Sequence, residues 1–279
     1  MNYIEKLRAS SDTFHSIVCL GLDPVLADIP IQDGGPRQRI YNFYESILNA
    51  LLHKKIYPAA VKPNYAFYAQ YGLEGIACCA DVIALYRNAG LPVILDVNIG
   101  STADAYSREA FDFFNADAVT LSPYMGYDSI EPFIKNYPSK GYYILNKTSN
   151  KSSADIQDIM VEGRPMYLHV ASKIAEWHKP GIGAVVGATY PEQLGQIAEV
   201  FVGSGKDIPL LIPGVGTQGG SVKDVCKELT RFSDVRIHRI NSSRAINYAY
   251  KKYSGLHFAD AAAQALKTLN DEINSLIFQ

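Results

Sequence analysis

Polar and charged side chains stand at the ends of short apolar segments in this 279-residue sequence. Asp96 lies at the end of the segment PVILDV, and Lys62 and Asn64 lie at the end of AAVKPN. Other segments of this kind end in Asp23, Pro123, Lys147-Thr148-Ser149, Pro213 and Ser243-Arg244. One charged side chain in such a place is often only solvated. Two acids, two lysines and an arginine that shared one pocket would instead form a site for a charged ligand.

Residues 213–220, with the sequence PGVGTQGG, have the composition of a phosphate-binding loop. Glycines allow backbone N–H groups to approach an anion closely, and a helix that begins just beyond them adds its positive end. Arg244 carries a planar guanidinium group that matches the geometry of a phosphate. Alternatively, these glycines form a tight turn that binds no ligand. A dinucleotide-binding loop is a weaker interpretation, because the next strand does not end in an acidic residue.

Lys62 and Asp96 could form an ion pair, because they end two consecutive apolar segments. Such a pair can be structural, whereas at the mouth of a pocket it is a candidate for acid–base or electrostatic catalysis. We predict no metal site, since the six histidines lack the spacing of metal ligands. No Gly-x-Ser-x-Gly segment supplies a nucleophilic serine. The residues therefore favour a metal-free site for a phosphorylated, polar small molecule.

Eight apolar segments are predicted to be the strands that position these residues. They are 17–23, 59–64, 92–97, 118–123, 142–148, 182–188, 209–215 and 236–244. The amphipathic segments between and after them predict helices at 37–54, 70–89, 101–114, 127–137, 155–178, 190–202, 219–231 and 257–277. Strands that are apolar throughout are typical of a parallel sheet covered by helices. Eight strand–helix units favour an α/β fold, a single-domain (β/α)8 TIM barrel over residues 1–279, in which the strand ends face one pocket.

The overall composition is that of an ordinary globular protein, with 48% hydrophobic residues and a formal net charge of −2. This charge argues against nucleic acid or a membrane surface as the main partner, since both usually bind basic faces. The four cysteines have no Cys-x-x-Cys spacing, which favours reduced thiols in a cytoplasmic protein. We expect neither a secretion signal nor a membrane span.

The strand ends resemble those of orotidine 5′-phosphate decarboxylases, and in particular the longer bacterial branch of that family. The similar segments occur in the family's order: CLGLDP (19–24), VKPNYAFYAQYG (61–72), LDVNIGSTADAY (95–106), ADAVTLSPYMGYDSIEPF (116–133), KTSNKSSADIQ (147–157), VVGAT (185–189), LIPGVGTQGG (211–220) and NSSRAI (241–246). The resemblance implies conversion of orotidine 5′-phosphate to UMP and CO₂ in de novo pyrimidine synthesis, without a metal or organic cofactor. In such enzymes a preorganised set of charges stabilises the transition state that leads to a carbanion at C6 of the pyrimidine.

The resemblance also implies roles for residues at the inner end of the pocket. Asp23 and Lys62 would contact the ribose, with Asn64 beside them as a further substrate-binding residue. Lys62 would also pair with Asp96, and these two are the candidate catalytic residues. Ser149 would contact the edge of the pyrimidine.

At the outer end of the pocket, the resemblance implies that Gln218 and Arg244 hold the phosphate, with Pro213 beside it. Thr102 would reach the ribose in the site of a neighbouring subunit, because barrels of this family pair face to face. We therefore expect a homodimer whose ligands are the small nucleotides orotidine 5′-phosphate and UMP.

The segment after Asp96 departs from the family's pattern. The third strand of the family ends Asp-x-Lys-x-x-Asp before Ile-Gly-x-Thr, whereas here only Val97 and Asn98 separate Asp96 from Ile99. The segment is three residues shorter, and it lacks both the lysine that protonates C6 and the second aspartate. Asn98 can donate a hydrogen bond but carries no charge. Because a proton donor contributes roughly 10²–10⁴-fold to a rate, we expect decarboxylation to be strongly impaired.

Three functions remain compatible with these residues. The first is an orotidine 5′-phosphate decarboxylase, and the second is a catalytically silent relative that binds UMP-like nucleotides. The first two functions share nucleotide binding through Gln218 and Arg244, and they differ in turnover. The third is another phosphate-binding barrel, such as an aldolase or isomerase, which would use Lys62 in a Schiff base or an acid–base pair.

Overall fold

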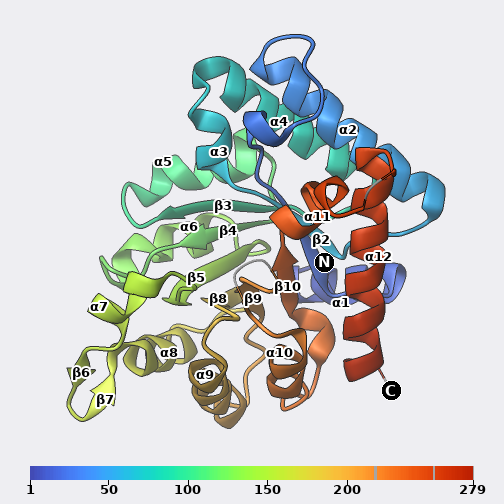
Figure 1. Cartoon of the computed structure of the whole chain (residues 1–279). Helices are drawn as coiled ribbons and strands as arrows, with labels where there is room; N and C mark the ends of the chain where they lie inside the picture. Colours follow the sequence, from blue (N-terminus) through green and yellow to red (C-terminus); the bar gives the residue numbers. More distant parts are fainter. Residues whose placement is uncertain (217–218, 254, 279) are drawn as a thin grey trace.

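A nearly closed barrel of parallel strands forms the centre of the molecule (Figure 1). The computed structural model describes residues 1–216, 219–253 and 255–278. The barrel strands are β1 (Val18–Leu22), β2 (Ala60–Pro63), β3 (Ile94–Ile99), β4 (Ala118–Leu121), β5 (Gly141–Lys147), β8 (Ile182–Val186), β9 (Leu210–Pro213) and β10 (Arg239–Ser242). Their order in the sheet is β2-β1-β10-β9-β8-β5-β4-β3. Isolated bridges Val61–Val93 and Asn64–Asp96 connect β2 to β3, so the predicted (β/α)8 barrel is confirmed.

The strands lie where the apolar segments predicted them. β1, β2, β4 and β8 are buried along their whole length. This burial is expected for strands that face helices on one side and the filled barrel interior on the other. β3 differs, because its first two residues are buried whereas the residues from Asp96 onward are partly exposed or exposed. β3 also continues to Ile99, two residues beyond the predicted end of this segment.

Helices surround the strands on the outside of the barrel (Figure 1). They are α2 (Pro36–Lys54), α3 (Tyr65–Ala69), α4 (Gly72–Asn88), α5 (Ala103–Arg108), α6 (Glu131–Asn136), α7 (Ala154–Gln157), α8 (Met166–Glu176), α9 (Pro191–Gly203), α10 (Val222–Leu229), α11 (Arg244–Asn247) and α12 (Phe258–Ile277). α12 packs against α2, α10 and α11. The last helix of the chain therefore joins the first and last parts of the helical layer.

A further helix, α1 (Tyr3–Phe14), covers the amino-terminal end of the barrel and is not among the predicted helices. It begins with a capping box, in which the side chains of Asn2 and Glu5 each accept a hydrogen bond from the other residue's backbone N–H. Tyr3 and Leu7 pack with Tyr143 and other side chains that point into the barrel. Because α1 fills this end, a ligand must enter at the carboxyl end of the strands.

The predicted helix 155–178 is wrong in its first half. After α7, the chain forms a hairpin of β6 (Met160–Val161) and β7 (Arg164–Pro165), and only then enters α8. Glu162 and Gly163 form the turn, with φ angles of 50° and 77°. Two consecutive positive φ angles are typical of a type I′ hairpin turn. The Gly163 and Pro165 in this segment are the sequence signals that break the helix.

The four cysteines are free and buried, which agrees with the predicted reduced thiols. Burial raises the pKa of Cys19 to about 12, so this thiol stays protonated at neutral pH. Among the helices of the described residues, none combines the length and the apolar character that crossing a bilayer requires.

Candidate active site

A cavity of about 270 Å³ opens at the carboxyl end of the strands. Its lining consists of Asp23, Lys62, Asn64, Phe67, Asp96, Ser149, Pro213, Gly214, Val215, Asn241, Ser242, Ser243 and Arg244. Seven of the nine predicted site residues are therefore brought together from separate strand ends. The eighth, Thr102, does not line this cavity. The ninth, Gln218, lies outside the described residues.

Lys62 and Asp96 form the ion pair at the inner end of the cavity. Lys62 is 4% exposed, and its Nζ donates a hydrogen bond to Oδ2 of Asp96. Burial by itself lowers the pKa of Lys62, but the carboxylates of Asp96 and Asp23 outweigh it and raise that pKa above its ordinary value. Lys62 is therefore an ammonium group that is already paired with a carboxylate.

Asn64 holds the strand end next to this pair. Its Oδ1 accepts a hydrogen bond from the backbone N–H of Ala66 and so caps α3. Its Nδ2 lies 3.4 Å from Oδ2 of Asp96. The same side chain thus begins a helix and supplies a second donor to the Asp96 carboxylate.

Asp23 brings a second carboxylate to the cavity, from the residue just after β1. Burial raises the pKa of this carboxyl group, while the charge of Lys62 and a hydrogen bond with Ser243 act in the opposite direction. Its Oδ1 is buried and has no hydrogen-bond partner among the described residues. A buried acceptor without a partner is available to a ligand hydroxyl group.

Ser149 is positioned by a loop that neighbouring elements hold in place. Oγ1 of Thr189 donates a hydrogen bond to the carbonyl of Ser149 at 3.2 Å. The backbone N–H of Thr148 donates to Oε1 of Gln157 at 2.9 Å. A Cβ atom at Gly187 would lie 2.8 Å from Cα of Ser149, so only glycine permits this close approach.

Lys147, in contrast, does not join the cavity, and the expectation that two lysines converge there is wrong. Lys147 is fully buried, and its Nζ forms an ion pair with Asp158 at 2.6 Å. The same ammonium lies 4.7 Å from the centre of the Tyr190 ring, a cation–π contact. The pairing of β5 with β8 is irregular between Leu145 and Lys147. Such an irregularity changes the face on which the following side chains lie.

Arg244 supplies the free cation at the outer end of the cavity. It is exposed at the first residue of α11, and no hydrogen bond or ion pair joins its side chain to another described residue. Gly214, just after the neighbouring strand β9, also lines the cavity, with a φ of 99° that favours glycine. Arg244 is therefore free to bind an anion that enters this end.

Thr102 is exposed and precedes α5, with a φ of 48°. It lines a separate hollow of about 300 Å³ together with Met125 and Ser129. Asn98, also exposed, has a φ of 54° and is absent from the lining of the main cavity. The segment from Val97 to Thr102 thus contributes no positively charged side chain to the cavity.

Four residues at or beside the site were not predicted as site residues. Phe67, Asn241 and Ser242 line the cavity, and Thr120 on β4 contacts Asp96. A polar residue inside an otherwise apolar strand segment is the signal that indicates Thr120. Asn241 and Ser242 lie in a segment that is mostly polar, so they do not stand out in it. Phe67 gives no such signal, because an aromatic residue on a helix usually belongs to the core.

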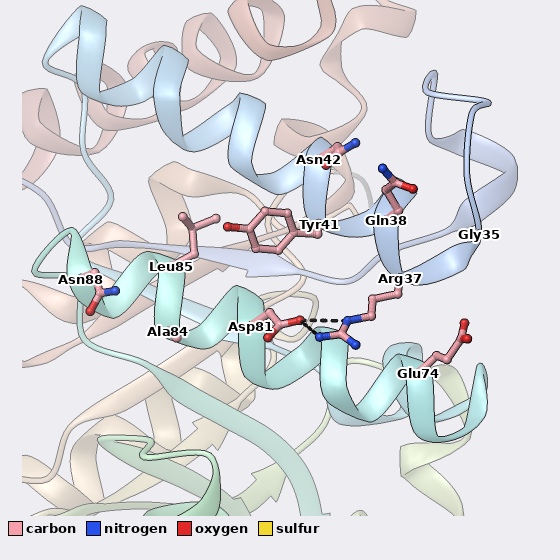
Figure 2. A pocket seen from close by; sticks show the side chains of 10 residues that line it. All are labelled: Gly35, Arg37, Gln38, Tyr41, Asn42, Glu74, Asp81, Ala84, Leu85 and Asn88. Atoms are coloured by element: carbon pink, nitrogen blue, oxygen red, sulfur yellow. Dashed lines mark hydrogen bonds and ion pairs between the residues drawn. The ribbon is translucent and has the colours of Figure 1, made fainter.

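A larger cavity, of about 680 Å³, lies between α2 and α4, away from the strand ends (Figure 2). Its lining is Gly35, Arg37, Gln38, Tyr41, Asn42, Glu74, Asp81, Ala84, Leu85 and Asn88. Arg37 and Asp81 form an ion pair across it at 2.8 Å, and both side chains are exposed. It is an open groove between two helices, and it collects none of the strand-end residues. We therefore place the candidate site in the smaller cavity.

Comparisons with known proteins agree on one family. A family model described as "Orotidine 5'-phosphate decarboxylase / HUMPS family" matches residues 16–254. A protein of Janthinobacterium sp. (strain Marseille) named orotidine 5′-phosphate decarboxylase is 40% identical, over 99% of this chain and 100% of that protein. A protein of Ralstonia pickettii (strain 12J) with the same name is 40% identical, over 98% of each chain.

A solved structure gives the same result. The structure described as Leishmania donovani OMP decarboxylase superposes with a TM-score of 0.81 at 33% sequence identity. The match covers 100% of both chains. Fold and sequence therefore lead to the same family over nearly the whole length.

Proposed function

The chain belongs to the orotidine 5′-phosphate decarboxylase / HUMPS family, and we propose that it converts orotidine 5′-phosphate to UMP and CO₂, with strongly reduced activity. The observation that carries this proposal is one cavity with Asp23, Lys62 and Asp96 at its inner end and Arg244, which has no partner among the described residues, at its outer end. That arrangement suits a nucleotide with a phosphate at one end and a polar ring at the other. The reaction would belong to pyrimidine nucleotide synthesis.

In this proposal, the outer end of the cavity binds the phosphate through Arg244 and Gln218, with Pro213 beside it. The ribose hydroxyls contact Asp23, whose buried Oδ1 lacks a partner among the described residues, and Lys62 with Asn64. Ser149 contacts the edge of the pyrimidine. Phosphate binding far from the reacting carbon can stabilise the closed site and so contribute to the rate.

The chemical step would be electrostatic. Loss of CO₂ leaves an electron pair on C6 of the pyrimidine, and a proton must then be delivered to that carbon. Asp96 would lie near the departing carboxylate and favour its loss by repulsion. Lys62 is the lysine among the described residues that line the cavity, but it is bound to Asp96 and so is poorly placed to deliver a proton. A displacement of about 1 Å can already cost 100-fold in rate, which is why we propose slow turnover.

A catalytically silent nucleotide-binding protein is the second candidate, and the same charges favour it. The inner end of the cavity holds the carboxyl groups of Asp23 and Asp96 against one ammonium, that of Lys62. A pyrimidine without a carboxylate, as in UMP, fits this balance better than the carboxylated pyrimidine of the substrate. The aldolase or isomerase alternative is disfavoured, because a Schiff base needs a neutral amine and the carboxylates keep Lys62 charged.

Two assays on the purified protein test these functions. The first follows the absorbance of orotidine 5′-phosphate, and the second measures UMP binding by calorimetry. Slow consumption together with UMP binding supports the decarboxylase. UMP binding with no consumption supports the silent relative. Absence of both orotidine 5′-phosphate consumption and UMP binding would refute both candidates.

We further propose that the protein is a cytoplasmic homodimer. Tyr124 and Met125 are exposed after β4, and Met125 shares a hollow with Thr102, the residue expected to reach a neighbouring site. Four buried free cysteines suit a reducing compartment. Sedimentation equilibrium tests the dimer, and a monomer at micromolar concentration would contradict it.

A further inference from the structure

Thr120 is a buried polar residue beside the candidate site, and it does not line the cavity. It lies in β4 and is 1% exposed. The other residues of β4, Ala118, Val119 and Leu121, are apolar. A hydroxyl group in this place is costly unless it is hydrogen-bonded, so its partners indicate what it does.

The Thr120 hydroxyl makes three contacts, all with the end of β3. Its Oγ1 donates to Oδ1 of Asp96 at 3.0 Å. The backbone N–H groups of Val97 and Asn98 both donate to the same Oγ1, each at 3.0 Å. A hydroxyl group has one proton to donate and two lone pairs to accept. The full hydrogen-bonding capacity of Thr120 is therefore used on three consecutive residues.

The register between β3 and β4 explains why these three residues need such a partner. Leu95 pairs with Val119, and the next pair is Ile99 with Leu121. Three residues of β3 thus lie opposite the single residue Thr120, and the strand bulges. Asn98 has a φ of 54° within this bulge. The threonine hydroxyl bonds to two amides that the bulge turns toward it.

The same contact fixes the orientation of Asp96. One carboxylate oxygen, Oδ1, accepts from Thr120, and the other, Oδ2, accepts from Lys62. With both oxygens bound, the carboxylate cannot rotate without breaking a charge-assisted hydrogen bond. Thr120 thereby holds the Lys62–Asp96 pair at the inner end of the cavity while lying outside the cavity itself.

We propose that Thr120 is a positioning residue of the nucleotide site, which acts by fixing the Asp96 carboxylate and the bulged end of β3. This inference rests on the proposed nucleotide-binding function. It adds a residue of β4, a strand that is absent from the cavity lining, to a site otherwise built from the residues of the cavity. It also explains how a shortened β3 exit still presents Asp96 to Lys62.

The test compares Thr120→Val, which removes the hydroxyl group at nearly constant volume, with Thr120→Ser, which keeps it. Calorimetry with UMP should give at least tenfold weaker binding for Thr120→Val and binding within threefold of the unmodified protein for Thr120→Ser. Thr268→Val on α12 is the matched control. Oγ1 of Thr268 also donates one hydrogen bond, to the Gln264 carbonyl, and Thr268 does not line the cavity. This variant should bind UMP normally.

A double variant distinguishes positioning from general packing. If Thr120 acts through Asp96, then Thr120→Val should add little to the loss already caused by Asp96→Asn. Independent, additive losses would overturn the proposal, as would normal UMP binding by Thr120→Val. Thermal unfolding of each variant shows whether the fold is kept.

Amide hydrogen exchange without any nucleotide gives a readout that does not depend on the proposed function. In the unmodified protein the amides of Val97 and Asn98 should be protected, and Thr120→Val should speed their exchange at least tenfold. Unprotected amides in the unmodified protein would overturn the inference, even if Thr120→Val failed to fold. Failure of the unmodified protein to bind UMP would instead refute the proposed function and leave the exchange result to decide the role of Thr120.

Discussion

At the scale of single residues, the site is defined by which of its charges are already paired. Lys62 is bound to Asp96, and Lys147 is bound to Asp158 outside the cavity. Arg244 has no partner among the described residues, and its side chain is exposed. The guanidinium of Arg244 is thus available to an anion, whereas the buried ammonium of Lys62 holds the Asp96 carboxylate.

Replacing Arg244 tests the proposed binding of phosphate at the outer end of the cavity. Arg244→Ala should weaken UMP binding by roughly 10- to 100-fold, because a charge-assisted hydrogen bond contributes about 1.5–3 kcal/mol. Calorimetry measures the effect. Arg37→Ala is the matched control, since Arg37 pairs with Asp81 in the groove between α2 and α4 and should leave UMP binding unchanged. Equal affinities for Arg244→Ala and the unmodified protein would remove Arg244 from the phosphate site.

The sequence predicts that these residues lie at strand ends more readily than it predicts whether their side chains point into the cavity. Asp23, Lys62 and Asp96 end apolar segments, and the barrel brings all such ends to one rim. Lys147 ends a segment too, yet it lies outside the cavity, where the register of β5 is irregular. A shift of one residue moves a side chain to the opposite face, and no local signal in the sequence marks such a shift.

At the scale of elements, the end of β3 decides what the site can do. Its residues after Asp96 bulge against Thr120 and carry no positive charge. The resemblance to the family implies a longer segment here, with a lysine that protonates C6. Hydrogen bonds from Thr120 order this element, and we propose that it lacks the proton donor of the reaction.

Lengthening this element should restore the missing chemistry. In the variant, Asn98 is replaced by four residues, Lys-x-x-Asp, which recreates the family's spacing between Asp96 and Ile99. We expect decarboxylation to rise by roughly 10²–10⁴-fold, the contribution of a well-placed proton donor. The rate of orotidine 5′-phosphate consumption measures it. An insertion of equal length with methionine in place of lysine is the control, and equal rates for both insertions would contradict this explanation.

The strands were predictable as elements, and some of the helices were not. The eight barrel strands overlap the predicted segments, and most of these segments are apolar because burial on both faces leaves a strong pattern. The segment of β10 is the exception, since Ile240 is the one apolar residue of that strand. The hairpin at 160–165 falls inside a helical pattern, and only Gly163 and Pro165 indicate it. α1 has apolar residues at helical spacing, but its role in closing the barrel depends on contacts with Tyr143, far away in the sequence.

At the scale of the whole molecule, the two ends of the barrel have different tasks. α1 and buried side chains fill the amino-terminal end, and the carboxyl end keeps the open cavity. Arg239 is fully buried near the filled end, where its guanidinium donates to the carbonyls of Leu7, Arg236 and His238. Stability at one end is thereby separated from ligand binding at the other.

His238 links this buried end to the pH dependence of stability. It is fully buried, and its Nδ1 accepts a hydrogen bond from the Leu210 backbone N–H at 3.0 Å. Burial, and next the charge of Arg239, lower its pKa to about 3. The unfolded chain takes up this proton near pH 6.5, so between about pH 6.5 and 3 the unfolded state binds more protons and stability falls as pH falls.

The predicted loss from pH 7 to pH 5 is about 2 kcal/mol in the free energy of unfolding from this residue. Urea unfolding at the two pH values measures it. His238→Asn keeps an acceptor for Leu210 but cannot titrate, so it should be less stable at pH 7 and lose about 2 kcal/mol less than the unmodified protein between pH 7 and 5. An unchanged pH dependence in that variant would show that His238 is not responsible.

We propose that the chain keeps the nucleotide site of its family without the usual proton donor. The most direct test is the rate at which the unmodified protein, in excess, consumes orotidine 5′-phosphate. We predict slow consumption, at least 100-fold below that of the variant with the lysine restored. Fast consumption by the unmodified protein would contradict the claim, and it would assign the proton transfer to a residue already in the cavity, Lys62 foremost.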